Sequence, residues 1–248
     1  MSSAHDRLAG LIRSARSVVA LTGAGVSVPS GIPDFRSPGT GLWENVDPME
    51  VAHISVWRRD PQRFWSFYGQ RFAVLDGKQP NGAHRALAEL GIPVITQNID
   101  GLHGRAGSRG VVEIHGSIAS ASCQVDGSRY PLAYARARME AAADGVPRCD
   151  CGEPLKPDVV LFGELLDETA MARASALAAG ADLMLCVGSS LEVYPAAGLP
   201  ELTLEAGGRI AVITKSATPF DRLAAVRLDG DVEEELAAVM AALANGGI

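Results

Sequence analysis

The chain has 248 residues, of which 47% are hydrophobic and 21% charged, and its formal net charge is -7. This length suffices for one large α/β domain with a smaller inserted part, and the composition excludes a disordered chain. The acidic balance excludes a basic surface for nucleic acid, so we expect no nucleic-acid partner.

The N-terminal segment and the cysteines indicate a cytoplasmic protein. Residues 1–17 contain several arginines and no apolar core of a signal peptide, and no apolar run has the length of a bilayer span, so no membrane partner is expected. Four cysteines are too few and too clustered for a secreted disulfide scaffold. Cys186 lies in an apolar run and is expected to be a small core residue.

The predicted elements alternate between strands and helices along most of the chain. Alternation of this kind is typical of a mostly parallel sheet with helices on both faces. Residues 29–47 are rich in Gly, Pro and Ser and predict a long loop, and periodicity is lost between about 121 and 156, which indicates an inserted module. Helices are expected near 4–16, 61–75, 81–90, 168–179, 198–206 and from 231, and strands at 18–22, 94–96, 111–114, 183–187 and 209–214.

Polar segments follow four of the predicted strands. Ligands of parallel sheets bind at the carboxyl ends of the strands, so we expect these segments to line one rim. They are Gly23-Ala24-Gly25, Gln97-Asn98-Ile99-Asp100, His115-Gly116 and Gly188-Ser189-Ser190.

The first of these segments resembles part of a dinucleotide-binding loop. Its glycines would let the backbone approach a pyrophosphate, but the third glycine of that pattern is replaced by Val28. A tight turn between strand and helix is an equal alternative. His115 could act as a general base, or it could be solvated or satisfied in the core. Asp34 and Arg36 could simply form a charge pair that orders their loop.

Five segments in order resemble the sirtuin family of the bacterial type. The resemblance spans about residues 18–215 and rests on long motifs. They are GAGVS continuing to SGIPDFR at 23–36, TQNIDGLH at 96–103, EIHG at 113–116, KPDVVLFGE at 156–164 and GSS at 188–190.

The resemblance implies an NAD-dependent protein-lysine deacylase made of a single catalytic domain, 1–248. Its doubly wound, Rossmann-like part would comprise about 1–36, 92–120 and 157–248. A smaller part would comprise 37–91 and the zinc-binding module at 121–156. In the family reaction nicotinamide leaves, the acyl oxygen attacks the ribose carbon, and the acyl group ends on ADP-ribose.

The resemblance also implies roles for individual residues. His115 is the base, while Asn98 and Asp100 border the nicotinamide and its ribose. Phe35 would shield the reacting ribose from water. The acyl-lysine substrate would pair as an added strand with Val160, Leu161 and Phe162. The NAD-binding set is Gly23, Ala24, Gly25, Ser27, Asp34, Phe35, Arg36, Gln97, Asn98, Asp100, His115, Gly188, Ser189, Ser190 and Thr214, the last standing where many sirtuins have Asn.

The cysteines depart from the family pattern. The two Cys-x-x-Cys pairs of sirtuins are here Cys123-x-x-Asp126 and Cys149-x-Cys151. Three thiolates and one carboxylate can still bind zinc, although Asp150 and Glu153 are nearby alternatives to Asp126 and the metal could be lost.

Tyr68 and Arg71 resemble the Tyr-x-x-Arg motif of sirtuins that remove succinyl and malonyl groups. Three residues apart on a helix, they could converge on one carboxylate. Alternatively Tyr68 belongs to a core stripe with Phe64 and Phe72, and Arg71 is a solvated charge. Desuccinylation and plain deacetylation are both left open.

Three other functions compete with deacylation. Glycine loops alone would also suit an NAD(P)-dependent dehydrogenase, which would form reduced nicotinamide. An ADP-ribosyltransferase or NAD hydrolase of the same fold would release nicotinamide without efficient deacylation. The retained His115, Asn98 and Phe35 argue against such a transferase or hydrolase. A non-enzymatic peptide-binding module is the third, and the retention of every expected catalytic residue argues against it.

Overall fold

A large parallel sheet organises the chain. The computed structural model describes residues 2–34, 46–75 and 77–246, with only the backbone described at 70 and 73. Six strands pair in parallel in the order β3-β2-β1-β7-β8-β9. The order reverses between β1 and β7, which is where doubly wound sheets bind ligands. The strands are β1 (Val18–Thr22), β2 (Val94–Thr96), β3 (Val111–Glu113), β7 (Leu183–Val187), β8 (Arg209–Ile213) and β9 (Val226–Leu228).

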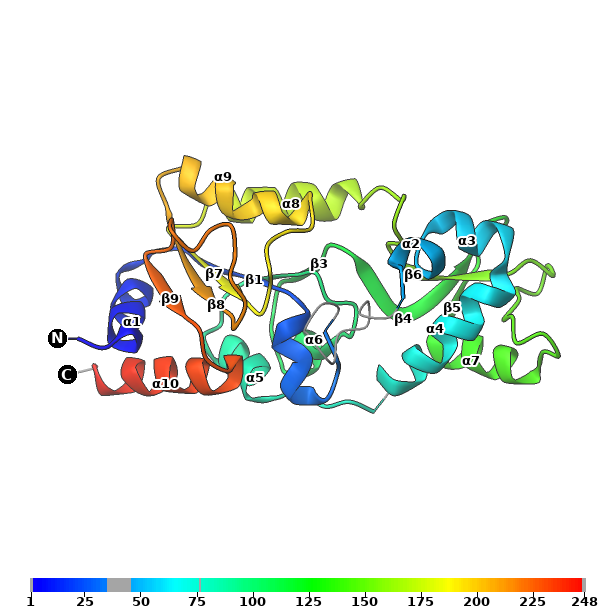
Figure 1. Ribbon diagram of the computed structural model, residues 1–248, viewed down its shortest axis with the longest axis horizontal. Coiled ribbons are helices and arrows are strands. Elements are labelled where there is room, and N and C mark those ends of the chain that lie inside the picture. Colours follow the sequence, from blue (N-terminus) through cyan, green and yellow to red (C-terminus); the bar gives the residue numbers. More distant parts are fainter. Residues whose placement is uncertain (1, 35–45, 76, 247–248) are drawn as a thin grey trace.

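Helices cover both faces of this sheet, as predicted (Figure 1). One face packs against α1 (Ala4–Ser14), α5 (Gly82–Glu89) and α10 (Val232–Asn245). The other face packs against α8 (Glu168–Ala179) and α9 (Leu199–Glu205). Successive residues of each strand point to opposite faces, so a strand covered on both sides must be apolar throughout. Cys186 of β7 is 1% exposed, which confirms it as a core residue.

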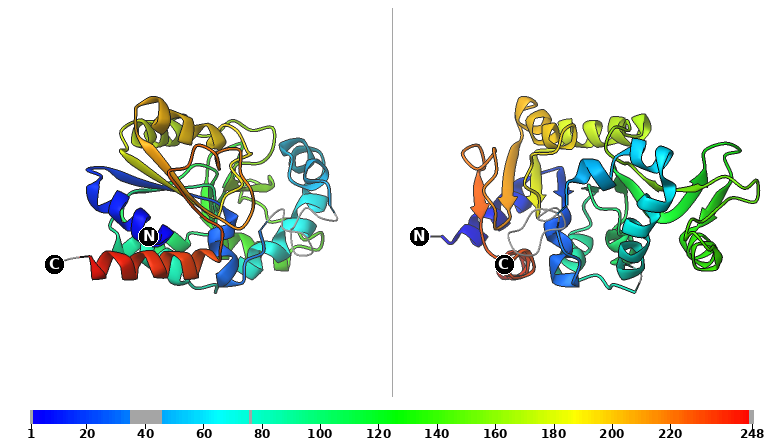
Figure 2. Two further views of the ribbon diagram at one scale, coloured as in Figure 1. Left: turned by 60° about the vertical axis from the view of Figure 1, so that its left-hand side comes forward. Right: turned by 45° about the vertical axis from the view of Figure 1, so that its right-hand side comes forward.

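A small antiparallel sheet lies at the end of the elongated molecule that is opposite the terminal helices α1 and α10 (Figure 2). Its order is β5-β4-β6, formed by β4 (Gly116–Cys123), β5 (Arg129–Pro131) and β6 (Leu155–Val159). Trp57 and Trp65 both donate their indole N–H to the Leu155 carbonyl, at 3.1 and 3.0 Å, and so attach two helices to β6. The helices of this end are α2 (Pro48–Val51), α3 (Ile54–Arg59), α4 (Pro61–Leu75) and α7 (Leu132–Ala141).

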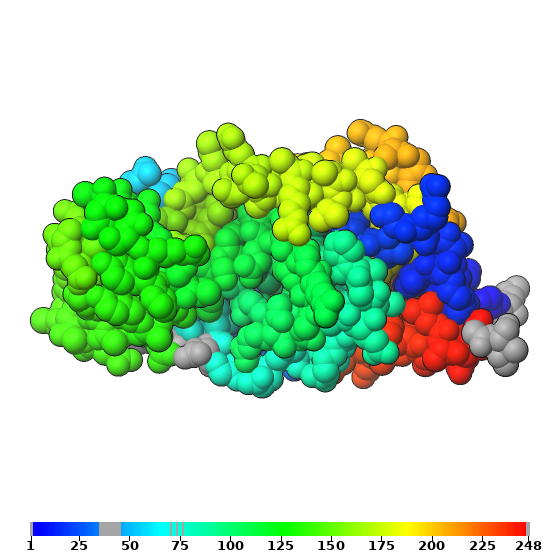
Figure 3. All heavy atoms as spheres, turned by 180° about the vertical axis from the view of Figure 1, so that it is seen from behind, coloured from blue at the N-terminus to red at the C-terminus, as the bar shows by residue number. Residues whose placement is uncertain are grey.

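Short helical turns complete the described fold. They are the 3-10 helices η1 (Ala24–Ser30) and η2 (Ala196–Gly198), and the one-turn helix α6 (Leu102–Arg105). Seen from behind, the molecule carries the small sheet at one end and the terminal helices α1 and α10 at the other (Figure 3). Within the described residues, no helix has both the length and the apolar character needed to span a membrane.

Candidate functional site

The four polar segments that follow β1, β2, β3 and β7 meet at one rim, as predicted. The Gly25 N–H donates to the Gly188 carbonyl at 2.8 Å, and Gln97 Nε2 donates to Ser189 Oγ at 2.8 Å. His115 donates from Nδ1 to the Gln97 carbonyl at 2.9 Å. Direct hydrogen bonds therefore connect segments that lie far apart in the chain.

The glycines of this rim allow two loops to touch backbone to backbone. Gly188 has φ +61°, and a Cβ there would lie 2.2 Å from the Val26 nitrogen. A Cβ on Gly25 would lie 2.7 Å from the Gly188 oxygen. The close approach that requires glycine is thus between the loops after β1 and β7, at the point where the strand order reverses.

Gly188→Ala is expected to destabilise the fold by about 2 to 5 kcal/mol, because left-handed backbone strain adds to overpacking. Gly91→Ala is the matched control, since Gly91 also has a positive φ (+67°) but nothing lies within 4 Å of its added Cβ. That variant should lose only about 1 to 2 kcal/mol from backbone strain. Urea unfolding measures both, and equal losses would contradict the close approach at Gly188.

Ser27, Asn98 and Asp100 form a hydrogen-bonded group beside these loops. Asn98 Nδ2 donates to the Gly23 carbonyl at 3.1 Å and to Ser27 Oγ at 3.0 Å. Ser27 Oγ in turn donates to Asp100 Oδ2 at 2.7 Å. The amide nitrogen of Asn98 is thus committed to the protein, and η1 is tied to the turn after β2.

The hydrogen bond of His115 determines which of its nitrogens can accept a proton. A carbonyl oxygen only accepts, so Nδ1 carries the hydrogen in the bond to Gln97 and the neutral ring keeps its lone pair on Nε2. Burial lowers the pKa of His115 below its usual 6.5, against a smaller opposing effect of the hydrogen bond to Gln97. A neutral imidazole with a free Nε2 has the properties of a general base at pH 7.

The segment 160–162 adjoins His115 through the backbone. The Val160 N–H donates to the His115 carbonyl at 2.9 Å, and Phe162 pairs through its N–H and carbonyl with Ala52 and Ile54. The Leu161 N–H donates to Glu164 Oε2 at 2.9 Å, and the same carboxylate oxygen lies 2.9 Å from Lys156 Nζ. All three N–H groups therefore already have partners within the protein, and the phenyl ring of Phe162 is exposed.

Beside this segment is a cavity of about 360 Å³. Its polar wall holds four carboxylates and one ammonium group. Burial raises the pKa of one of them, Glu113, with a further contribution from Asp100. The ionisable lining residues are Glu113, Lys156, Asp158, Glu164 and Asp167.

Tyr68 and Arg71 were expected either to bind a carboxylate together or to be a core tyrosine and a solvated arginine. The structure agrees with the second interpretation for Tyr68 but not for Arg71. The ring of Tyr68 stacks between Phe64 and Phe72 at centroid distances of 4.8 and 5.2 Å, which is the aromatic stripe of the alternative interpretation. Burial raises the pKa of its hydroxyl. Arg71 is not a freely solvated charge: it lies 3.6 Å above the ring of Phe67 and donates from Nη1 to the Phe67 carbonyl at 2.7 Å. Its Nε is buried, with no hydrogen-bond partner among the described residues.

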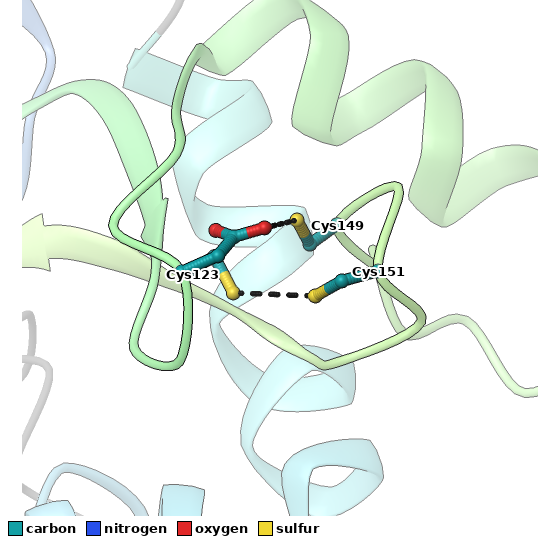
Figure 4. A group of neighbouring side chains, drawn as sticks. Cys123, Cys149 and Cys151 are labelled. Carbon is teal, nitrogen blue, oxygen red and sulfur yellow. Dashed lines mark hydrogen bonds between the residues drawn. The ribbon is translucent and has the colours of Figure 1, made fainter.

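Cys123, Asp126, Cys149 and Cys151 converge at the tip of the small sheet. Their ligand atoms all lie within 4.8 Å of one another. The Sγ atoms of Cys123 and Cys151 are 3.6 Å apart, and Cys149 Sγ lies 3.2 Å from Asp126 Oδ2. Figure 4 shows the three thiols pointing toward one centre. A tetrahedral zinc with Zn–S bonds of about 2.3 Å needs ligand separations of about 3.7 Å, so this donor set fits one zinc ion.

The surroundings of Asp126 and Cys149 favour their ionised forms. At Cys151, the Cys149 and Cys123 thiols together with burial outweigh the Glu153 backbone and raise the pKa of the thiol. The Ser128 N–H donates to Asp126 Oδ1 at 2.9 Å and holds the pKa of that carboxyl below its usual range. The Cys151 backbone lowers the pKa of the Cys149 thiol, and the Tyr130 hydroxyl, 3.3 Å from that sulfur, acts in the same direction. Thiolates and carboxylates are the forms that bind zinc. Asp150 instead pairs with Tyr134 and Arg138.

The remaining candidate residues are placed as follows. Thr214 is buried directly after β8, and its N–H donates to the Leu228 carbonyl at 3.0 Å. Asp34 ends the first described stretch of the chain, while Phe35 and Arg36 lie outside the described residues. Sequence reasoning did not identify the buried polar residues beneath the rim, Thr22, His84, Thr96 and His103.

The fold belongs to the doubly wound α/β class, and comparison with known proteins identifies the family. The model of the Sir2 family matches residues 23–195. An NAD-dependent protein deacetylase of Caldivirga maquilingensis is 46% identical over 240 residues, covering 94% of this chain and 91% of that protein. An NAD-dependent protein deacylase of Thermus thermophilus is 40% identical over 239 residues, covering 92% and 91%.

A solved structure agrees with these relatives. A Sir2 variant in a structure with a deacetylated p53 peptide and 3'-O-acetyl ADP-ribose has a TM-score of 0.91 and 38% identity, covering 98% of both chains. The chain therefore belongs to the Sir2 family, the sirtuins.

Proposed function

We propose that this sirtuin is an NAD-dependent protein-lysine deacylase. It transfers the acyl group of a modified lysine to ADP-ribose and releases nicotinamide. The observation that carries the proposal is the meeting at one rim of His115, Asn98 and the loops after β1 and β7, in a chain whose named relatives are deacetylases and deacylases. The balanced reaction converts NAD, acyl-lysine and water to nicotinamide, lysine and O-acyl-ADP-ribose.

The residues of the rim divide the work between binding and proton transfer. His115 accepts a proton from a ribose hydroxyl at Nε2, and the Gln97 carbonyl stabilises the resulting imidazolium through Nδ1. Asn98 and Asp100 border the nicotinamide and its ribose, with Ser27 holding both. The other NAD-binding residues of the proposal are Gly23, Ala24, Gly25, Asp34, Phe35, Arg36, Gln97, Gly188, Ser189, Ser190 and Thr214.

The peptide substrate lies against the segment Val160–Phe162, between the large and small sheets. The three N–H groups of this segment are already bonded, and the Leu161 and Phe162 carbonyls accept from the Glu164 and Ile54 N–H groups. Pairing with the peptide therefore depends mainly on the Val160 carbonyl and on the exposed ring of Phe162. The NAD-binding part of the single catalytic domain then comprises 1–36, 92–120 and 157–248. We add α5 to it, because Ala83 and Leu87 pack in the core of the large sheet.

Cys123, Asp126, Cys149 and Cys151 hold one structural zinc ion. Zinc would cross-link the segments on either side of α7, which share few apolar contacts. Since its thiols must stay reduced to bind metal, we place the protein in the cytoplasm.

The test is deacylation that requires NAD. An acetyl-lysine peptide incubated with the protein should lose its acetyl group only when NAD is present, with free nicotinamide as a product. Deacetylation without NAD, or formation of reduced nicotinamide in place of free nicotinamide, would overturn the proposal.

A preference for acidic acyl groups is favoured by one observation, the buried Nε of Arg71, which has no hydrogen-bond partner in the part of the chain that the structure describes. A guanidinium held in this way is suited to a carboxylate such as that of succinyl-lysine. Arg71→Met should reduce kcat/KM for succinyl-lysine by an amount equivalent to about 2 to 5 kcal/mol and leave acetyl-lysine nearly unchanged.

Arg63→Met is a matched control, because Arg63 lies on the same helix in an exposed ion pair with Glu50. Equal losses of Arg71→Met on both substrates, or no loss on either, would show that Arg71 does not recognise the acyl chain.

A further inference from the structure

A pair of buried histidines lies beneath the rim. His84 on α5 is 0% exposed and His103 on α6 is 2% exposed, and their rings are 4.8 Å apart. Burial lowers the pKa of both, that of His103 to about 3, so both rings are neutral at pH 7. Two neutral histidines at this depth need a reason, because an apolar side chain would fill the space without a buried polar atom.

Donor and acceptor counting shows what His103 does. Its Nε2 lies 2.9 Å from Thr22 Oγ1, and Thr22 Oγ1 donates to Thr96 Oγ1 at 2.8 Å. A hydroxyl has a single hydrogen, so with that hydrogen on Thr96 the Thr22 oxygen can only accept from His103. Nε2 is therefore the protonated nitrogen, and Nδ1 keeps a bare lone pair. Nδ1 is buried without a partner among the described residues.

The chain of hydrogen bonds ends at the turn after β2. Thr96 Oγ1 accepts the Asn98 backbone N–H at 3.0 Å. This turn holds much of the rest of the site: its Gln97 carbonyl accepts from His115, and its Asn98 amide donates to Gly23 and Ser27. Displacing the turn would therefore move the base and the loop after β1 together.

We propose that His103 is a positioning residue for deacylation, which acts from its Nε2–H through the hydroxyls of Thr22 and Thr96 on the turn that carries Gln97 and Asn98. His103 is buried away from the substrates, so its effect is on geometry. Hydrogen bonds in a buried, low-dielectric network are strong and hold its members in place, and small displacements of reacting groups lower the rate strongly. The inference rests on the proposed deacylase function.

Replacing His103 by asparagine or by glutamine gives a matched test, because the two side-chain amides differ in reach. The amide nitrogen of glutamine reaches as far as the Nε2 of histidine. That of asparagine reaches only as far as Nδ1, for which the described residues offer no partner. His103→Asn should lower kcat for acetyl-lysine about 10-fold to 100-fold and change KM for the peptide little. His103→Gln should recover a rate within about threefold of the wild type, because it restores the donor. Equal rates for the two variants would overturn the proposal.

A second pair covers the case in which both His103 variants fail to fold. Thr96→Val removes the hydroxyl with little change of shape, and Thr96→Ser keeps it. The valine variant should lose about 10-fold or more in kcat and the serine variant should not. Loss in both, or in neither, would contradict a role for the hydroxyl.

Nitrogen-15 NMR of the unmodified protein tests the hydrogen bonds of His103 without using activity. His103 should be the neutral Nε2-protonated tautomer, and it should stay neutral at pH 5. Protonation at Nδ1 would overturn the inference even if deacylation is found. If the wild type shows no NAD-dependent deacylation, the proposed function fails, and with it the catalytic role of His103, whatever tautomer the spectrum reports.

Discussion

His115→Ala is expected to lower kcat/KM for deacylation by about 10²-fold to 10⁴-fold, the usual contribution of a positioned general base. The substitution removes the proton-accepting Nε2. Its cost to the fold is the loss of the hydrogen bond from Nδ1 to the Gln97 carbonyl, so the fold and NAD binding should persist. Peptide deacylation followed by chromatography measures the rate, and calorimetry measures NAD binding. A variant that deacylates at nearly the wild-type rate would show that His115 is not the base.

The dependence on pH follows from the same residue. A general base must be neutral, and burial lowers the pKa of His115 below 6.5. The rate should therefore increase as the pH rises through this lowered pKa, and it should level off once the imidazole is fully neutral. His5→Ala, on α1 at the far end of the molecule, is the control and should keep both the rate and the profile (Figure 1).

Removal of zinc should strongly lower the stability of the protein. We expect about one zinc ion per chain by elemental analysis, and a loss of about 4 kcal/mol on chelation if free zinc stands near 1,000 times its Kd. Cys149→Ser should lose the metal, since it removes one of four converging ligands. Thermal unfolding with and without chelator is the measurement.

Three further variants separate the zinc ligands from other residues. Asp126→Cys should keep the zinc, because it supplies a fourth thiolate, while Asp126→Ala should bind it weakly. Cys186→Ala is the control, as this core cysteine on β7 is remote from the cluster. Metal-free protein that is fully folded and active would contradict a structural zinc.

The sequence was sufficient to predict the large sheet but not the small one. Strands buried on both faces are continuous apolar runs, so β1, β7 and β8 could be recognised. β9 is only three residues long with a central Arg227 and was missed. In the small part of the molecule, α7 buries only Ala135, and the pairing of β4 with β6 shifts register between Gly116 and Ala121. Neither element shows a regular hydrophobic period.

The site was predictable where its residues follow strands, because the carboxyl ends of parallel strands share one edge. His115, Asn98 and Ser189 could be grouped for this reason. The bonds between Thr22, Thr96 and His103 join residues 74 and 81 positions apart, and no local pattern signals such a pairing. Thr22 and Thr96 are also adjacent across β1 and β2, a register that only the folded sheet determines.

Product stoichiometry tests the central claim most directly. The purified protein is incubated with NAD and an excess of acetyl-lysine peptide, and nicotinamide, O-acetyl-ADP-ribose and deacetylated peptide are quantified by mass spectrometry. Acyl transfer to ADP-ribose predicts equal amounts of the three, and their joint loss in His115→Ala. Nicotinamide accompanied by unacylated ADP-ribose and intact peptide would identify an NAD hydrolase, and would contradict the deacylase function proposed for this chain.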